Sequence, residues 1–293
     1  MHFIQVLISG LMLGGIYSLI SIGLTMIFGV VRVINFAHGE FLMVAMFLVY
    51  WLNVLLGIDP YVSILITVPV MFLFGMLIQR ILIQPIQNSP ATIKIFSTLG
   101  LGFMLSNLAL MLWKADYRTV SVDYSTAVIN ISELNISIPR LVAFCAALLV
   151  AIIMFQFLNR TDIGKQIRGV SQHRDAALLM GINVKKIYVI AFGIGSSLVG
   201  LAASLLMPMY YVYPSVGALF SLIAFVVVVL GGLGNMYGAF LGGLIIGLIE
   251  ALAGTYIDPG LKEVVYFVVF ILILLFRPSG LLSLGKGSEE VGL

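Results

Sequence analysis

Charged residues and cysteine are both scarce in this sequence. Only 9% of the 293 residues are Asp, Glu, Lys or Arg, whereas soluble domains carry about a quarter. The mean hydropathy is +1.17, which excludes a soluble fold. The single cysteine, Cys145, lies in an apolar run, so a disulfide framework and a thiolate metal site are excluded too. Nucleic-acid binding is not expected, because no basic patch is interleaved with exposed aromatic residues.

The sequence also lacks the motifs of common hydrolytic chemistry. It contains no GxxxxGK[ST], HExxH or GxSxG pattern. We therefore expect a chain that is not an enzyme and binds no cofactor itself, so any energy for transport must come from another chain or from an ion gradient. Residues 1–30 lack a basic N-terminal region, and their apolar run is too long for a typical signal peptide.

Long apolar stretches make up most of the chain. A transmembrane helix needs roughly 20 mostly apolar residues, and nine stretches approach or exceed this length, the seventh being short. The sequence predicts an all-α polytopic membrane protein, a single transmembrane domain over residues 1–293 embedded in a lipid bilayer, with about nine helices (roughly eight to ten). The predicted spans are 3–31, 36–56, 61–81, 93–113, 139–158, 187–207, 217–230, 237–255 and 261–276.

Residues 159–186 form the longest polar run and set the predicted orientation. Basic loops between spans stay in the cytoplasm. With this loop inside, the alternation of spans puts eleven basic residues inside and four outside, the N-terminus outside and the C-terminus in the cytoplasm. The largest outer loop, 114–138, alternates small polar and β-branched residues, which fits a short hairpin and an irregular loop equally well. The basic residues of the polar run are Arg160, Lys165, Arg168, Arg174, Lys185 and Lys186.

Two segments interrupt the apolar pattern, one in each half of the chain. They are Asn35-Phe-Ala-His-Gly-Glu40 and the glycine-rich Leu230–Gly238. Paired breaks of this kind are typical of discontinuous helices around a transport pathway, although ordinary cytoplasmic turns at helix ends are an alternative. Our candidate pathway residues are Asn35, His38, Glu40, Gly231, Gly232, Gly234 and Asn235.

Glu40 and Glu250 are carboxylates within predicted spans, where a charge is costly and indicates either function or a buried partner. For Glu250 a structural role fits at least as well as a transport role. His38 and Glu40 supply two ligands, fewer than the three or four of a metal site, so no metal is expected. A proton relay would need further acids along the same spans.

Three stretches, read together, resemble a known family. They are 14–29 followed by Val33-Ile-Asn-Phe-Ala-His-Gly-Glu40; Gly164 to Gly181 with Ile182-Asn-Val; and Val229-Leu-Gly-Gly-Leu-Gly-Asn followed by 236–243. Their order and spacing, over nearly the whole chain, are similar to the LivH-type permease of bacterial branched-chain amino acid ABC transporters. The resemblance implies the all-helical fold of ribose-type and vitamin B12-type importer permeases, located in the bacterial cytoplasmic (inner) membrane as a multi-pass protein.

The resemblance also implies partners. These are a second related permease, two cytoplasmic ATP-binding subunits that use the ATP, and a periplasmic or extracytoplasmic solute-binding protein. Loop 159–186 would be the cytoplasmic coupling loop, with a short helix started by Asp175 and ended by Gly181. Leu178, Leu179 and Ile182 would enter an ATPase groove. The candidate coupling residues are Asp175, Ala176, Leu178, Leu179, Gly181 and Ile182.

One departure from the family pattern bears on the solute. Family members associated with leucine transport tend to carry a Lys and small polar residues before the Leu-Gly-Gly turn, whereas residues 220–229 here are more apolar and lack Lys. The expected function is import of branched-chain or related hydrophobic amino acids. Import of urea, short amides or another small solute by the same machinery is the first alternative. A stand-alone secondary transporter or channel is the second, and a non-transporting scaffold the third.

Overall fold

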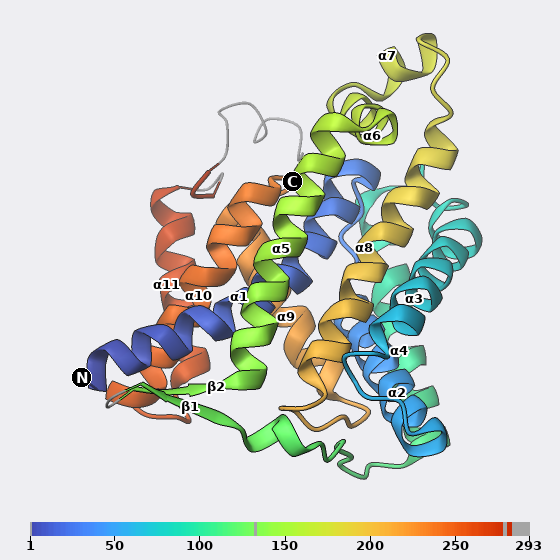
Figure 1. The fold of residues 1–293 in the computed structure, drawn as a ribbon. Coiled ribbons are helices and arrows are strands. Elements are labelled where there is room, and N and C mark those ends of the chain that lie inside the picture. The colour runs from blue at the N-terminus through green and yellow to red at the C-terminus, as the bar shows by residue number, and fades with distance from the viewer. Residues whose placement is uncertain (1, 132–133, 278–279, 283–293) are drawn as a thin grey trace.

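The computed structural model describes residues 2–131, 134–277 and 280–282, and this part of the chain forms a helical bundle with one small hairpin (Figure 1). Helix α3 continues into a π-helical turn over Gln79–Ile83. The α-helices are α1 (His2–Val31), α2 (His38–Leu56), α3 (Ile64–Ile78), α4 (Ala91–Trp113), α5 (Ile138–Arg160), α6 (Asp162–Gln172), α7 (Arg174–Leu179), α8 (Val184–Leu206), α9 (Val216–Gly231), α10 (Met236–Tyr256) and α11 (Lys262–Phe276).

Each of the nine predicted spans corresponds to a helix. Seven helices in the described part of the chain are long and apolar enough to cross a bilayer, namely α1, α2, α3 with its π-helical extension, α4, α5, α8 and α10. Helices α9 and α11 have 16 and 15 residues, and at 1.5 Å per residue they are shorter than the hydrocarbon core of about 30 Å. The all-α polytopic prediction is confirmed: in the described part of the chain, seven of the nine predicted spans are long helices and two are shorter apolar helices.

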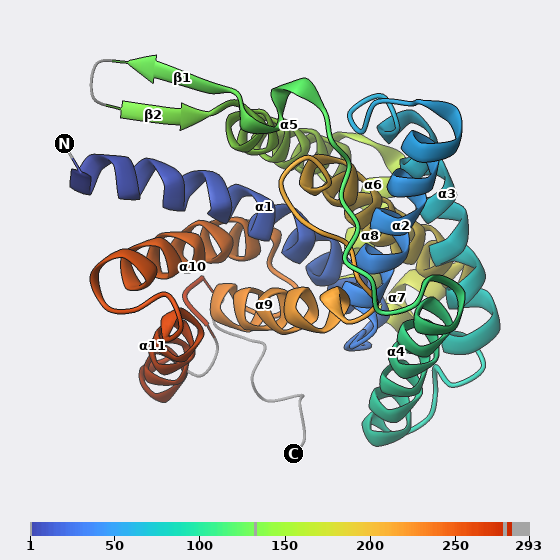
Figure 2. The same ribbon diagram turned by 90° about the horizontal axis from the view of Figure 1, so that it is seen from below.

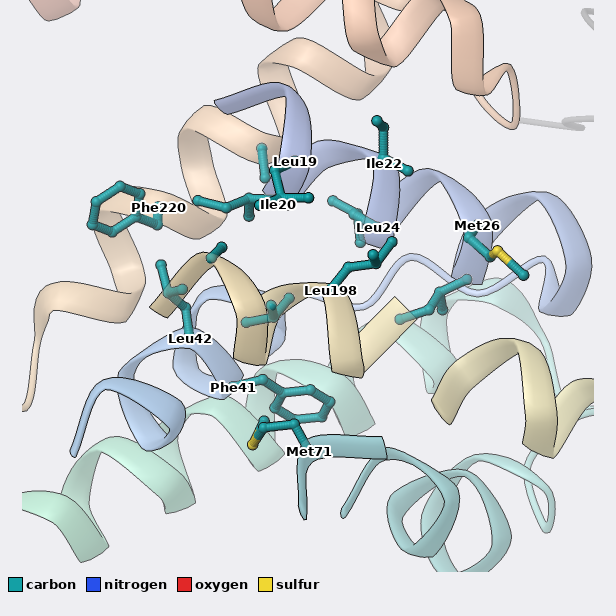
Figure 3. Close-up of a cluster of buried hydrophobic side chains, with 14 of the residues drawn as sticks. Leu19, Ile20, Ile22, Leu24, Met26, Phe41, Leu42, Met71, Leu198 and Phe220 are labelled. Carbon is teal, nitrogen blue, oxygen red and sulfur yellow. The ribbon is translucent and has the colours of Figure 1, made fainter. Parts of the chain in front are cut away.

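Helix α1 is the centre of the bundle, where it packs against α5, α8, α9 and α10. Small residues bring α1 and α10 close together, because a Cβ added to Gly14 would lie 2.7 Å from the Cα atom of Leu244. Such close contact between small residues is the usual way in which membrane helices associate. Figure 3 shows the core beside this contact, in which Ile20 and Leu24 of α1 lie near Leu198 and Phe220.

The two ends of the bundle differ. Helices α6 and α7 lie at one end, and the hairpin of β1 (Val128–Ile131) and β2 (Leu134–Ser137) lies at the other (Figures 1 and 2). The strands pair antiparallel, with Asn130 opposite Asn135. The side chain of Gln5 fixes the hairpin to α1, since it donates to the Asn135 carbonyl oxygen at 2.6 Å and accepts from the Asn135 N–H at 2.9 Å. A hairpin in loop 114–138 is therefore confirmed over Val128–Ile131 and Leu134–Ser137, whereas the alternating residues 119–122 form no strand.

Candidate functional site

The polar run 159–186 contains two short helices, and α7 projects beyond the rest of the bundle (Figure 1). Gly181 ends α7 with φ +79°, a left-handed conformation that glycine adopts without steric cost. The N–H of Gly181 donates to the Leu178 carbonyl oxygen at 3.0 Å, and the N–H of Ile182 donates to that of Ala177, also at 3.0 Å. These two bonds form a Schellman cap, so the expected stop at Gly181 is confirmed.

The start of α7 differs from the expectation. His173, not Asp175, occupies the N-cap position, and Asp175 lies in the first turn of the helix. A carboxylate in the first turn still interacts favourably with the helix dipole. Asp175 and Ala176 are both exposed, so their side chains face away from the bundle.

The tip of α7 carries an exposed apolar surface. Leu178, Leu179 and Met180 have exposed fractions of 50%, 88% and 82%. Ile182, which was expected to share this surface, is half-buried and packs against the core of the chain itself. Met180 was missed because it follows the helix at its C-cap, where the helical period no longer predicts a direction. We call Leu178, Leu179 and Met180 the α7 tip.

Helix α6 differs from the sequence expectation, which was a loop with a single short helix. Thr161 caps α6 by accepting from the Gly164 N–H at 3.0 Å. Ile167 and Val170 are buried on one face, three residues apart, and this helical spacing was the available signal. Gly164 is needed for the sharp turn from α5, because a Cβ there would overlap the Phe157 carbonyl oxygen.

The first break lies inside the protein. Residues 32–35 between α1 and α2 are not helical, yet Val33, Asn35 and Ala37 are buried. The Oδ1 atom of Asn35 accepts from the Ala37 N–H at 3.2 Å and so closes the turn that starts α2. Non-helical backbone at membrane depth must be enclosed by protein or line a wet cavity. This segment is therefore not an ordinary exposed turn.

The first turn of α2 connects α1 with α9. The Nε2 atom of His38 lies 3.0 Å from the Ile20 carbonyl oxygen in the middle of α1. The hydroxyl of Ser221 accepts from the Gly39 N–H at 2.8 Å and lies 3.2 Å from Oε2 of Glu40. A Cβ on Gly39 would overlap the Gly217 carbonyl oxygen, so α2 and α9 are in backbone contact. His38 and Glu40 thus join three helices at one point.

The second break has the geometry of a capped turn. Gly232 and Gly234 have φ values of +101° and +84°, and Leu233 is exposed at the turn. Gly231 lies against the backbone of Gly238, where a Cβ would overlap it. Asn235 caps α10 by accepting from the Gly238 N–H at 3.1 Å, and its amide donates to the Leu282 carbonyl oxygen at 2.7 Å. The turn is thus fastened to residues 280–282.

The two breaks lie near the same end of α1 without forming one site. A Cβ on Gly29, near the end of α1, would be 3.2 Å from the Cα atom of Gly234, whereas His38 contacts α1 at Ile20 and Glu40 contacts α9 at Ser221. The sequence expectation grouped the seven residues in one pathway. In the structure they form one enclosed cluster and one separate turn, in which Gly231 and Gly232 are buried and Gly234 is exposed.

Contacts connect the first break with α6 and α7. Arg32, which begins the break and has a positive φ of 54°, donates through Nη2 to the Ser171 carbonyl oxygen of α6 at 3.4 Å. The side chain of Gln87 donates to the Val31 carbonyl oxygen at 2.8 Å. Arg174 donates to Oδ1 of the adjacent Asn88 at 3.4 Å. The end of α1 is therefore in contact with the same loops that carry α7.

Comparisons with known proteins cover almost the entire chain. Residues 6–274 match the family described as "Branched-chain amino acid transport system / permease component". The permease BraD of the high-affinity branched-chain amino acid transport system of Pseudomonas aeruginosa is 32% identical, over 96% of this chain and 96% of its own. The corresponding LivH of Escherichia coli K12 is 31% identical, over 97% and 96%.

A more distant similarity joins the chain to another kind of permease. A probable branched-chain amino acid transport permease, LivM of Methanocaldococcus jannaschii, is 24% identical over 92% of this chain and 90% of its own. No solved structure gives a significant match.

Proposed function

This chain belongs to the family of permease components of branched-chain amino acid transport systems, and on that premise we propose that it forms part of the membrane pathway of an ATP-driven importer. The solute would be a branched-chain or related hydrophobic amino acid. The chain would bind no nucleotide itself, and two cytoplasmic ATP-binding subunits would hydrolyse the ATP. An extracytoplasmic binding protein would deliver the solute.

The observation that carries this proposal is the α7 tip. Three neighbouring apolar side chains that are at least half exposed lie on a short helix that projects from the bundle (Figure 1). Exposed apolar groups of this kind mark an interaction site. Because the same run holds six basic residues, the positive-inside rule supports a cytoplasmic location. A groove on a cytoplasmic ATPase would receive Leu178, Leu179 and Met180.

A movement of α7 would be transmitted to the solute pathway through contacts with the first break, residues 32–40. The tip is joined to α6, and α6 contacts Arg32 through the Ser171 carbonyl oxygen. Arg32 begins the segment that leads to Asn35, His38 and Glu40. We assign Asn35, His38 and Glu40 to the solute pathway or its gate. The turn 231–235 would hold the cytoplasmic ends of α9 and α10 together. ATP binding and hydrolysis would then shift α2 relative to α1 and α9.

The proposed setting is a bacterial cytoplasmic membrane with α6, α7 and the C-terminus inside. A second related permease would complete the pathway, since the family includes both LivH-type and LivM-type chains. The fold of ribose-type and vitamin B12-type importer permeases belongs to the same proposal. Import of urea or short amides uses the same machinery and is the competing interpretation, because residues 220–229 lack the Lys of the leucine-associated pattern.

Co-purification from the native membrane in mild detergent tests the assembly. We expect an ATP-binding subunit and a second permease of similar size to elute with this chain, and the double substitution Leu178→Asp with Leu179→Asp to release the ATP-binding subunit alone. A chain that elutes by itself and moves solute without ATP would instead be a stand-alone transporter or channel.

A further inference from the structure

Glu250 lies in a polar cluster that is distant from both helix breaks in the sequence. Its side chain is only 7% exposed, and its two carboxylate oxygens have different partners. Oε1 accepts from Nζ of Lys262 at 2.7 Å, and Oε2 accepts from the hydroxyl of Tyr17 at 2.6 Å. The three residues come from α10, α11 and α1, so the cluster joins three helices.

The cluster forms part of a small pocket with polar and apolar sides. Tyr210 and Tyr266 add hydroxyl groups, and the Tyr266 hydroxyl is buried with no hydrogen-bond partner in the described part of the chain. Leu219, Phe220 and Ile223 of α9 form an apolar wall. The pocket therefore combines the buried acid Glu250, the exposed acid Glu263, one lysine, an unsatisfied hydroxyl and an apolar surface.

The pocket lies toward the end of the bundle that carries the hairpin. Phe3 of α1 contacts Tyr256 at the end of α10, with ring centroids 6.4 Å apart, and Gln5 is bonded to β2. Glu250 lies six residues before Tyr256 along α10. Under the proposed orientation this is the outer side, where a binding protein would release its solute.

The two side chains of the Glu250–Lys262 ion pair differ in exposure, which would allow Lys262 to leave the pocket. The Lys262 side chain is 41% exposed and can turn toward water, whereas Glu250 at 7% cannot. A buried ion pair adds little net stability compared with apolar packing, but loss of one partner leaves a costly unpaired charge. Separation of the pair is therefore costly unless another cation takes the place of Lys262 beside Glu250.

We propose that Glu250, Lys262 and Tyr266 form a subsite for the ammonium and carboxylate groups of a zwitterionic amino acid. The solute ammonium would replace Lys262 on Glu250, and the solute carboxylate would accept from Lys262 and from the Tyr266 hydroxyl. An aliphatic side chain would lie against Leu219, Phe220 and Ile223. The exchange leaves no buried charge unpaired, because a zwitterion supplies one charge of each sign.

A neutral solute cannot supply the positive charge that Glu250 needs when Lys262 moves away. A urea or amide molecule that separated Lys262 from Glu250 would leave the carboxylate without a cation. The cavity is about 40 Å³, enough for a water molecule but not for an amino acid, so the proposed exchange requires that the pocket widens when Lys262 leaves Glu250. This inference rests on the proposed function and, within it, favours zwitterionic amino acids over the competing urea or short amides.

Cysteine protection tests the subsite in the assembled transporter. In a Cys145→Ser background, Glu263→Cys at the pocket edge, which keeps the Glu250–Lys262 pair, is treated with 2-aminoethyl methanethiosulfonate in nanodiscs without the binding protein. Millimolar L-leucine should slow the labelling about threefold, as expected when about two-thirds of the sites are occupied, whereas 4-methylpentanamide should not. Lys114→Cys, an exposed lysine outside the pocket, is the matched control and should react at one rate in all solutions.

The same reagent, applied to Lys262→Cys, tests whether transport requires a positive charge at position 262. Labelling of the thiol introduced by Lys262→Cys restores a cationic side chain close to lysine in length and should restore ATP-driven leucine uptake, while the anionic 2-sulfonatoethyl reagent should not. If Lys262→Cys fails to assemble, the protection assay on Glu263→Cys still tests the subsite with the ion pair intact.

The outcomes separate the two proposals. Equal labelling with and without leucine, or equal protection by the amide, overturns the subsite even when the wild-type transporter imports leucine with ATP. Failure of the wild-type assembly to import any amino acid overturns the proposed function itself.

Discussion

The hydroxyl oxygen of Ser221 lies 3.2 Å from Oε2 of Glu40 and links α9 to the first turn of α2. The same oxygen accepts from the Gly39 N–H and lies 3.1 Å from the Phe36 carbonyl oxygen. A serine hydroxyl has one proton to donate, so the carboxylate and the carbonyl oxygen compete for it. Any movement of α2 relative to α9 changes which of the two oxygens receives the Ser221 proton. The hydrogen bonds of the first break therefore depend on the relative position of these two helices.

Replacement of Glu40 by Gln tests whether this carboxylate serves transport. The amide keeps the size of the side chain but loses the charge that the first turn of α2 favours. We expect ATP-driven uptake to fall about tenfold, which corresponds to about 1.4 kcal/mol in the barrier, while the thermal midpoint stays near that of the wild type. Asp116→Asn, an exposed acid, is the control and should leave uptake unchanged. Wild-type kinetics in Glu40→Gln would assign Glu40 a structural role.

Replacement of Ser221 by Ala tests the link itself. Removal of the hydroxyl leaves the Gly39 N–H without its acceptor, and an unsatisfied buried group costs about 1–3 kcal/mol. We expect a lower thermal midpoint in detergent, measured by size-exclusion chromatography after heating. Ser97→Ala is a suitable comparison, because the Ser97 hydroxyl donates to the Ile93 carbonyl oxygen of its own helix at 2.7 Å in an exposed hydrogen bond; an equal decrease in both variants would argue against the link.

The contact between Gly39 and Gly217 predicts a steric effect. A methyl group at Gly39 would overlap the Gly217 carbonyl oxygen, and overpacking of this kind costs about 1–3 kcal/mol. Gly39→Ala should therefore lower both stability and uptake. Gly100→Ala is the matched control in an open helical position, and alanine there should be neutral or stabilising by about 0.5–1 kcal/mol. Equal thermal midpoints for the two variants would contradict the packing.

Substitution of Gly181, which caps α7, should impair coupling to the ATPase without unfolding the bundle. Gly181 has φ +79° and open space around it, so alanine meets no clash but costs about 1–2 kcal/mol in the left-handed conformation. We expect Gly181→Ala to disorder the α7 tip and reduce uptake, with the bundle still folded. Gly181→Asn should retain more uptake, since asparagine tolerates this conformation better. Higher uptake in the alanine variant than in the asparagine variant would exclude the cap as the cause.

The sequence predicted the helices well because the bilayer imposes a simple rule on their length and polarity. The predicted stretch 187–207 and helix α8 at Val184–Leu206 agree within a few residues. Helix α6 was missed because a polar helix at the membrane surface needs only one narrow apolar face, here Ile167 and Val170.

The sites were less accessible to sequence reasoning than the helices. Glu250 and Tyr17 are 233 positions apart, and no local pattern connects them. The direction of Ile182 depended on how α7 folds back onto α6, where a Cβ on Gly169 would contact Ile182. Composition likewise did not show that the break at Asn35 is more enclosed than the turn at Gly234, because burial depends on which helices pack over each segment.

ATP-driven uptake into proteoliposomes tests the central claim most directly. The complex that co-purifies with this chain is reconstituted with its binding protein outside and ATP inside, and the accumulation of labelled L-leucine is measured. We predict accumulation that requires ATP, and its loss in the Leu178→Asp, Leu179→Asp variant but not in Leu178→Met, Leu179→Met, which keeps the α7 tip apolar. Accumulation that proceeds without ATP, or that survives the aspartate substitutions unchanged, would contradict the account.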